Sequence, residues 1–253
     1  MGAKVKFDLT KFLAFTILII GFSSQVYAEN KLVKIGVGNW PPYYSKDGQS
    51  GIFIEIINEA LRRAKIVNYK LIPTGHLRRT EWFERKELDI AVNLTTPPNV
   101  AKTHSLRVLP YSGTIITLKD SSKIRTLSDL AGLSIGSFIG SKTVYGEKFS
   151  KAMLNAHFTE IIDTNLIPRM LLHGRFDAIA LDKYIFLSKL KKLEPEAFKE
   201  RNYTFHGLLP ITRAVIYFHD AEIWKAFKLA LEDMQEDGSF SDIFEQNLKK
   251  LAE

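Results

Sequence analysis

The first apolar segment of the chain is short and continuous. Phe12 to Phe22 contains one polar side chain, Thr16, with lysines before it and the small-residue tripeptide Val26-Tyr27-Ala28 after it. A helix that spans a bilayer needs roughly 20 apolar residues. Lysines, a short apolar run and small residues in this order are typical of a secretory signal peptide. We therefore predict that residues 1–28 are a signal peptide, cleaved after Ala28, and that the protein is periplasmic.

After this segment, the spacing of apolar residues changes repeatedly between that of strands and that of helices. Lys31–Gly38 (KLVKIGVG) alternates as a strand does, and apolar residues in Ile52–Lys65 recur at helical spacing. Asn68–Pro73 and Leu88–Leu94 are predicted as further strands, with a short helix at Arg79–Lys86 between them. The order β-α-β-α-β is typical of a parallel sheet covered by helices.

A second unit of the same kind begins at Ser112–Leu118. Its predicted strands and helices alternate in this order: Thr126–Leu130 (helix), Leu133–Gly136 (strand), Ser141–Ala152 (helix), Phe158–Ile162 (strand), Leu166–Leu172 (helix), Phe176–Leu181 (strand) and Tyr184–Leu190 (helix). The chain then returns through a strand at Ala214–Phe218 to two helices, around Ile223–Glu236 and Phe240–Leu251. This pattern predicts an α/β fold of two lobes joined by two crossings, near Tyr111–Leu118 and Gly207–Tyr217. We expect residues 29–115 and 210–253 to form one lobe and residues 116–209 the other.

Composition narrows the class of protein. Hydrophobic residues make up 45% and charged residues 25% of the chain, as in ordinary globular proteins. The chain has no cysteine, which excludes a small disulfide-stapled scaffold and a lipid-anchored cysteine at the cleavage site. The formal charge of +7 is spread along the chain rather than clustered, so we expect no nucleic-acid partner. We expect a soluble monomer.

Five segments, in order, resemble those of the bacterial periplasmic solute-binding proteins of family 3. They are KIGVGNWPPYYSKDGQSGIFIEIINEAL, ELDIAVNLTTPPNVAKTHSLRVLPYSG, LSDLAGLSIGSFIGSKTVYGEKF, LLHGRFDAIALDKYIFL and LEDMQEDGSFSDIFEQ. The resemblance covers essentially all of the chain after the signal peptide. It implies the periplasmic binding protein type II fold, in which each lobe is a mostly parallel sheet flanked by helices. It also implies a small polar solute, amino-acid-like or related, bound between the lobes.

The resemblance places several residues of the first lobe at the ligand. Trp40 and Tyr43 fall in the loop that packs against the ligand, where an aromatic ring offers stacking or cation–π contact. The alternative, equally well supported for either ring alone, is that the ring closes the core under the Pro-Pro loop. Asn93, Thr95 and Thr96 follow a strand and would hold a carboxylate or carbonyl of the ligand; the alternative is that they form the turn before two prolines.

In the second lobe, the resemblance indicates the start of a helix and the end of a strand. Ser141, with Lys142 and Thr143, opens a helix whose N–H groups would bind an anion, or else Ser141 simply caps that helix. Asp182 follows the strand Phe176–Leu181, in the position where family members hold the ligand amine. Carboxylates at such strand ends commonly line a ligand crevice.

The chain departs from the family at one position. The family's carboxylate-binding arginine should lie between Asn99 and Lys102, where this sequence has no arginine. Lysine replaces the planar guanidinium poorly. Either Lys102 or an arginine from elsewhere takes its place, with Arg79 the best candidate, or the ligand is not a free α-amino acid. As a single residue, Arg79 is also explained as an ordinary solvated helix residue.

Three classes of function are candidates for this sequence. The first is a non-catalytic receptor that closes on a solute and delivers it to an ABC-type inner-membrane permease or to a sensor protein. The second is an enzyme on the same scaffold, similar to cyclohexadienyl dehydratases, with Glu55 and Glu59 as acid or base candidates. The third, a peptidoglycan-lytic enzyme, is disfavoured because no further domain follows in this sequence. HExxH, GxSxG and clustered metal ligands are absent from the sequence, so we expect no catalytic residues, cofactor or metal.

Overall fold

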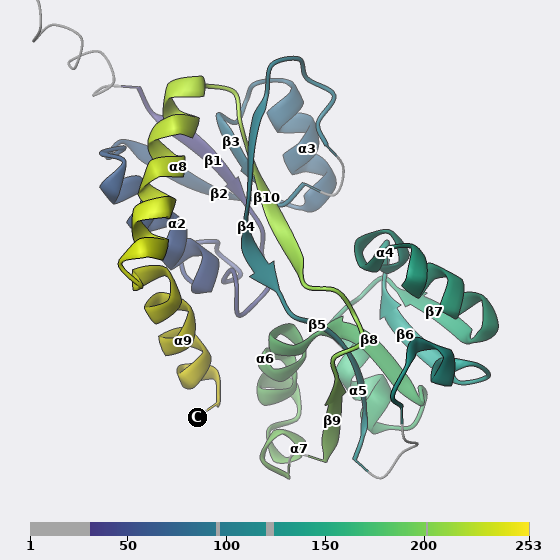
Figure 1. The fold of residues 1–253 in the computed structure, drawn as a ribbon. Coiled ribbons are helices and arrows are strands. Elements are labelled where there is room, and N and C mark those ends of the chain that lie inside the picture. The colour runs from purple at the N-terminus through teal and green to yellow at the C-terminus, as the bar shows by residue number, and fades with distance from the viewer. Residues whose placement is uncertain (1–30, 95–96, 120–123, 201, 253) are drawn as a thin grey trace, which may run out of the picture.

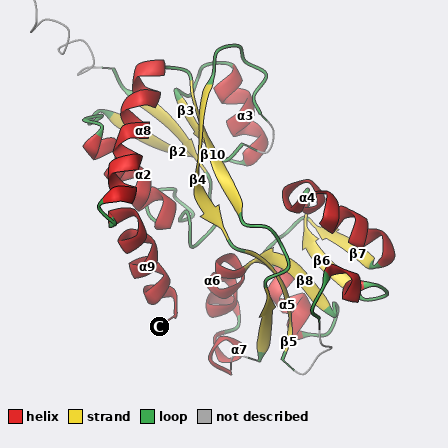
Figure 2. Ribbon diagram, in the orientation of Figure 1, coloured by secondary structure: helices red, strands yellow, loops and turns green. Residues whose placement is uncertain are grey.

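The computed structural model describes residues 31–94, 97–119, 124–200 and 202–252. In this part of the chain two five-stranded sheets, each with helices on both faces, form two lobes (Figure 1, Figure 2). The predicted signal peptide, Thr95 and Thr96 lie outside the described residues. No helix within the described ranges combines the length and the apolar character needed to cross a bilayer.

The first lobe is built on a sheet that includes one strand, β10 (Thr212–Phe218), from a distant part of the chain. Its order is β2 (Tyr69–Pro73), β1 (Val33–Val37), β3 (Ile90–Val92), β10 and β4 (His104–Tyr111). β1 is parallel to β2 and β3, and β10 runs antiparallel to both of its neighbours. The helices of this lobe are α2 (Ile52–Arg63), α3 (His76–Glu84), α8 (Ala221–Glu236) and α9 (Ser239–Ala252). α2 and α8 share one apolar core with the sheet, and α3 packs on the opposite face.

The second lobe repeats this plan. Its sheet has the order β7 (His157–Ile161), β6 (Ser134–Phe138), β8 (Ala178–Asp182), β5 (Gly113–Leu118) and β9 (Tyr203–His206). The short helices η1 (Leu127–Leu130) and η2 (Met153–Asn155) cover one face together with α4 (Ser141–Ala152). The other face is covered by α5 (Leu166–Leu172), α6 (Lys183–Leu193) and α7 (Pro195–Glu200).

Two segments connect the sheets. Ser112 separates β4 of the first sheet from β5 of the second, and residues 207–211 separate β9 from β10. Figure 1 shows these connections running between the lobes beside each other. In proteins that undergo hinge closure, the hinges are a few loop or element-terminal residues between two domains.

The lobes also touch through helices. The ring of Tyr184 in α6 lies edge-on to that of Phe244 in α9, with centroids 6.3 Å apart. Further along α6, the ammonium of Lys191 donates to the carbonyls of Lys250 and Leu251 at 3.3 and 3.4 Å. The C-terminal turn of α9 therefore ends against the second lobe.

Differences from the predicted elements lie mainly at sheet edges. β4 and β9, which sit at the edges of their sheets, and the short helix α7 were not predicted, and α3 begins at His76 rather than Arg79. An edge strand has few fully buried positions: β9 has none, and β4 carries Arg107 and Pro110 among exposed and half-buried residues. Without a continuous apolar pattern, such strands leave little signal in the sequence.

Candidate functional site

The loops that follow six parallel strands face the space between the lobes. β1, β2 and β3 point toward the second lobe, and β6, β7 and β8 point toward the first (Figure 1). Ligands of α/β proteins collect beyond the carboxyl ends of such strands. We call the residues of these loops, 38–41, 74–77, 93–94, 139–142, 162–165 and 182–184, the interlobe region.

The Pro-Pro loop after β1 is fixed to the start of α2. The N–H groups of Ile52 and Phe53 donate to the carbonyls of Pro42 and Tyr43, at 3.1 and 3.0 Å. Gly51 makes this contact possible: it has φ 116°, and a Cβ there would lie 2.6 Å from the Tyr43 carbonyl oxygen. The backbone of the loop is thereby held against the first lobe.

Tyr43 is a buried residue of this loop. Its ring stacks on Phe53 with centroids 4.3 Å apart and meets the edge of Tyr111 at 4.7 Å. Its hydroxyl donates to Oδ2 of Asp182 in the second lobe, at 3.0 Å. Tyr43 therefore contributes to the core, as one of the two alternatives predicted, and also links the lobes.

Asp182 receives four hydrogen bonds from this chain. Oδ1 accepts from the backbone N–H groups of Tyr184 and Ile185, both at 2.9 Å, so the side chain caps α6. Oδ2 accepts from the Ser112 N–H at 2.6 Å in addition to the Tyr43 hydroxyl. The residue is 4% exposed. In this arrangement both oxygens are engaged, and the expected contact with a ligand amine stays a prediction.

The surroundings of Asp182 change its acid strength. Burial raises the pKa of Asp182 to about 6, although its backbone and hydroxyl donors oppose the shift by stabilising the charge. Burial, and then the charge of Asp182, raise the pKa of the Tyr43 hydroxyl far above its usual value. At neutral pH the pair is therefore a tyrosine hydroxyl donating to a carboxylate.

Arg79 lies under the first-lobe loops and is 1% exposed. One terminal nitrogen donates to the carbonyls of Val37 and Thr74, at 3.0 and 2.8 Å. The other donates to the Asn93 carbonyl at 3.0 Å and lies 3.3 Å from Nδ1 of His76. Arg79 therefore ties together the segments that follow β1, β2 and β3, and it is not a solvated helix residue.

The charge of Arg79 has no carboxylate partner among the described residues. Burial lowers the pKa of Arg79, and the hydroxyls of Tyr44 and Tyr111 are the groups that favour its charged form. Its Nε is buried without a hydrogen-bond partner. A positive charge is therefore held under the first-lobe loops, while the buried Asp182 carboxylate holds a negative charge in the second lobe.

Trp40 and Asn93 stand at the ends of β1 and β3. Both are half-buried, and the Trp40 ring lies 6.4 Å from that of His76. Asn93 adopts φ 57° and its side-chain amide donates to the Tyr111 hydroxyl at 3.1 Å. Asparagine tolerates this backbone region better than most residues. Both side chains lie in the interlobe region, and their expected contact with a ligand stays a prediction.

At the start of α4, a carboxylate of the chain occupies the expected anion position. Oε1 of Glu160 accepts from the Gly140 N–H at 3.0 Å and lies 3.5 Å from the buried Ser141 hydroxyl. Lys142 lies over the Phe158 ring at 4.8 Å, and the Thr143 N–H donates to the Gly140 carbonyl. Glu160 was not among the predicted site residues, although its place near the end of a strand was a usable signal.

The acid and base candidates of the dehydratase hypothesis do not lie in the interlobe region. Oε2 of Glu55 accepts from the Asn247 amide in α9 at 2.8 Å. Glu59 pairs with Arg62 and Arg63, and these bonds lower the pKa of Glu59 to about 2. Lys102, the alternative to Arg79, is exposed.

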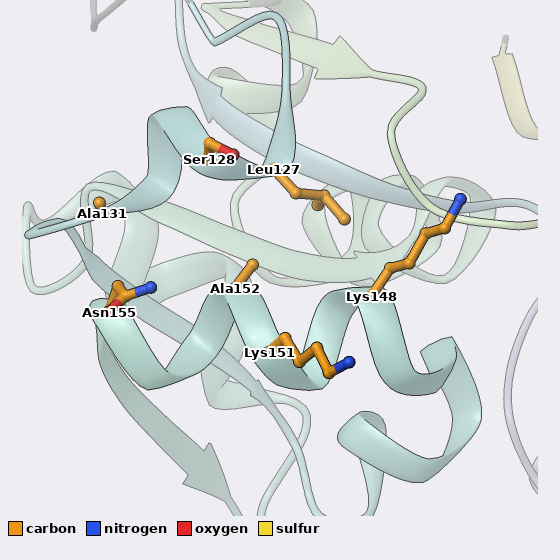
Figure 3. A pocket seen from close by; sticks show the side chains of 7 residues that line it. All are labelled: Leu127, Ser128, Ala131, Lys148, Lys151, Ala152 and Asn155. Carbon is orange, nitrogen blue, oxygen red and sulfur yellow. The ribbon is translucent and has the colours of Figure 1, made fainter.

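A separate hollow of about 540 Å³ lies beside the second half of α4. Figure 3 shows Lys148 and Lys151 on α4, with Leu127 and Ser128 of η1 opposite. It lies at the end of α4 remote from the interlobe region. Within the described ranges, no three His, Asp or Glu side chains are grouped as metal ligands would be.

Comparisons with known proteins identify the fold. No protein-family model and no curated protein sequence matches this chain. An ancestral arginine-binding protein bound to arginine has a similar structure, with 18% identity over 86% of this chain and 98% of the other, and a TM-score of 0.64. The unliganded, open L-cystine solute receptor of Neisseria gonorrhoeae is 21% identical over 87% and 94%, with a TM-score of 0.60.

A third similar structure is an arginine-bound substrate-binding protein of an amino-acid ABC transporter from Streptococcus pneumoniae. It is 15% identical over 88% of this chain and 96% of that one, with a TM-score of 0.65. At these identities the likeness establishes the fold. The predicted fold class, two α/β lobes of the periplasmic binding protein type II kind, is confirmed.

Proposed function

We propose that this protein is a periplasmic solute-binding protein of the family 3 kind, which captures a small solute between its lobes. The observation that carries the proposal is the pair of facing strand ends on two lobes joined by two short connections. Proteins with this arrangement close around their ligands by hinge rotation. The arginine- and cystine-binding proteins of similar structure support the same role.

The two sheets support a division of the chain into two lobes. We propose that residues 29–115 and 210–253 move as one body and residues 116–209 as the other. β4 and β10 belong to the first sheet while β5 and β9 belong to the second, which supports crossings at Ser112 and at residues 207–211; residues 113–115 are already part of β5.

We propose that the solute contacts Trp40, Asn93 and the following loop in the first lobe, and Ser141 to Thr143 in the second. We propose that the buried residues Tyr43, Arg79 and Asp182 shape the site through the loops and the helix that they hold. Residues 1–28 would export the protein to the periplasm, where a monomer passes the solute to an ABC-type permease or to a sensor.

A thermal-shift screen of the processed protein against amino acids, their derivatives and small organic acids tests the function. A ligand at 100 times its Kd should stabilise the folded state by about 2.7 kcal/mol, which gives a clear rise in Tm. Small-angle scattering with the same ligand should show a more compact particle. If no solute raises Tm, the proposal fails, and turnover of a bound solute seen by mass spectrometry would establish an enzyme instead.

A further inference from the structure

The polar groups expected to anchor an amino acid are engaged by the chain itself. Asp182 accepts four hydrogen bonds and Arg79 donates to three backbone carbonyls. The carboxylates nearest the loops after β6 and β7 also have backbone donors: Glu160 accepts from Gly140 and Asp163 accepts from Asn165, both at 3.0 Å. No buried carboxylate among the described residues is left to receive an ammonium group.

Exposed apolar side chains are concentrated in and beside the second-lobe part of the interlobe region. Ile139 follows β6 directly and is 59% exposed, and Ile162 follows β7 directly and is 87% exposed. β6 and β7 are neighbouring parallel strands whose last residues, Phe138 and Ile161, are paired. The two isoleucines therefore extend the same edge of the sheet side by side. Val144, in the first turn of α4, and Leu166, at the start of α5, are also exposed.

The first lobe presents a matching apolar edge. Leu77 lies in the first turn of α3, just after β2, and is 84% exposed, while Trp40 is half-buried after the neighbouring strand β1. Figure 1 shows α3 of the first lobe facing α4 of the second. A rotation at the two connections that closed the lobes would bring these edges toward each other, and a solute enclosed there would meet apolar surface on both sides.

The charge below the first-lobe edge determines the polar end of such a solute. Arg79 is buried without a carboxylate partner among the described residues. Because water has little access to the guanidinium, the electric field of its charge is poorly screened. An anion on the first-lobe side of the interlobe region is therefore favoured, and a solute ammonium there would be repelled by the same charge. On the second-lobe side, the carboxylates of Asp182, Glu160 and Asp163 already accept hydrogen bonds from the chain.

We propose, on the basis of the proposed function, that the solute is a small carboxylate with an apolar body and no ammonium group. Its apolar body lies between Trp40 and Leu77 on one lobe and Ile139 and Ile162 on the other. Asp182 joins the lobes through Tyr43 instead of holding a ligand amine.

The test uses pairs of compounds that differ only in the α-ammonium group. 3-Phenylpropionate is compared with phenylalanine, and 4-methylpentanoate with leucine, by thermal shift and calorimetry on the processed protein; arginine and glutamine are measured in parallel. We expect the acids without the ammonium group to bind at least about ten-fold more tightly than their amino-acid counterparts, a difference of about 1.4 kcal/mol.

Variants test the apolar edges separately. Leu77→Ser and Ile139→Ser should each weaken binding of the better acid about ten-fold, because each removes apolar surface that the solute buries. Val67→Ser and Leu154→Ser are matched controls: these residues are 72% and 77% exposed but lie outside the interlobe region, so their binding should be unchanged.

The inference is overturned if phenylalanine, leucine, arginine or glutamine binds more tightly than the acids without an ammonium group. It is also overturned if Leu77→Ser and Ile139→Ser bind the better acid as tightly as the control variants do. If the wider screen finds only solutes of other classes, the inference fails while the proposed function stands. If no solute of any class binds, both fail.

Discussion

Removing the Tyr43 hydroxyl should destabilise the protein, and the loss should depend on pH. In Tyr43→Phe, the ring keeps its packing on Phe53 and Tyr111 while Oδ2 of Asp182 loses a buried donor at 3.0 Å. A hydrogen bond to a charged group contributes ~1.5–3 kcal/mol, so we expect a loss of this size in the free energy of unfolding at pH 7.5.

The sign of the pH dependence follows from the pKa of Asp182. Its folded-state pKa is raised from 3.8 to about 6, so the native state binds the proton more tightly than the unfolded chain. The contribution of this group to stability therefore falls as pH rises through that interval, by roughly 3 kcal/mol in total. The Tyr43 hydroxyl opposes this shift, so without it the pKa rises further and the fall becomes larger. The loss in Tyr43→Phe should be clearly smaller at pH 4.5 than at pH 7.5.

Urea unfolding followed by circular dichroism at the two pH values measures both quantities. Tyr69→Phe is the matched control, because its hydroxyl donates to the neutral Asn58 amide oxygen at 3.0 Å. We expect about 1 kcal/mol for this control, equal at both pH values. An equal loss at both pH values for Tyr43→Phe, or a loss no larger than that of the control, would refute the reasoning.

Three further predictions concern export, the buried guanidinium and packing. Protein purified from the periplasm of its native host should begin at Glu29 by N-terminal sequencing, and a retained leader would contradict this. Arg79→Met should lower the free energy of unfolding by about 3 kcal/mol or more, since it leaves backbone carbonyls without their donor, whereas exposed Arg78→Met should change it by less than about 0.5 kcal/mol. Gly136→Ala should cost ~1–3 kcal/mol because the new Cβ would lie 2.5 Å from a buried phenylalanine ring, whereas Gly207→Ala meets no atom within 4 Å and should be near neutral in the same urea assay.

The lobes were predictable from the sequence because their central elements have strong patterns. All five residues of β8 are buried, and the buried residues of α2 recur at helical spacing, so strand and helix differ clearly in period. The edge strands β4 and β9 carry mixed exposed and buried positions and were missed. Their places depend on pairing with β10 and β5, which are far away in the sequence.

The sequence predicted where the candidate site lies better than it predicted which partners its side chains have. The strand end at Asp182 was identified, but its partner Tyr43 is 139 residues away, and a carboxylate that begins a helix can either cap it or bind a ligand. For Arg79, both a ligand contact and a solvated position were considered. The structure places it under the loops because three strand ends present carbonyls there in place of water. Contacts of this kind are set by tertiary packing, which spacing along the chain does not record.

The contact of α9 with the second lobe makes the end of the chain a natural place for an optical reporter. Lys191 in α6 holds the last carbonyls of α9, so any rotation of the lobes changes the surroundings of this turn. The chain has no cysteine, so a thiol introduced at the exposed Lys250 would be its only one and would carry a single fluorophore. Its emission would follow lobe movement directly in solution, without a radioactive solute or a membrane partner.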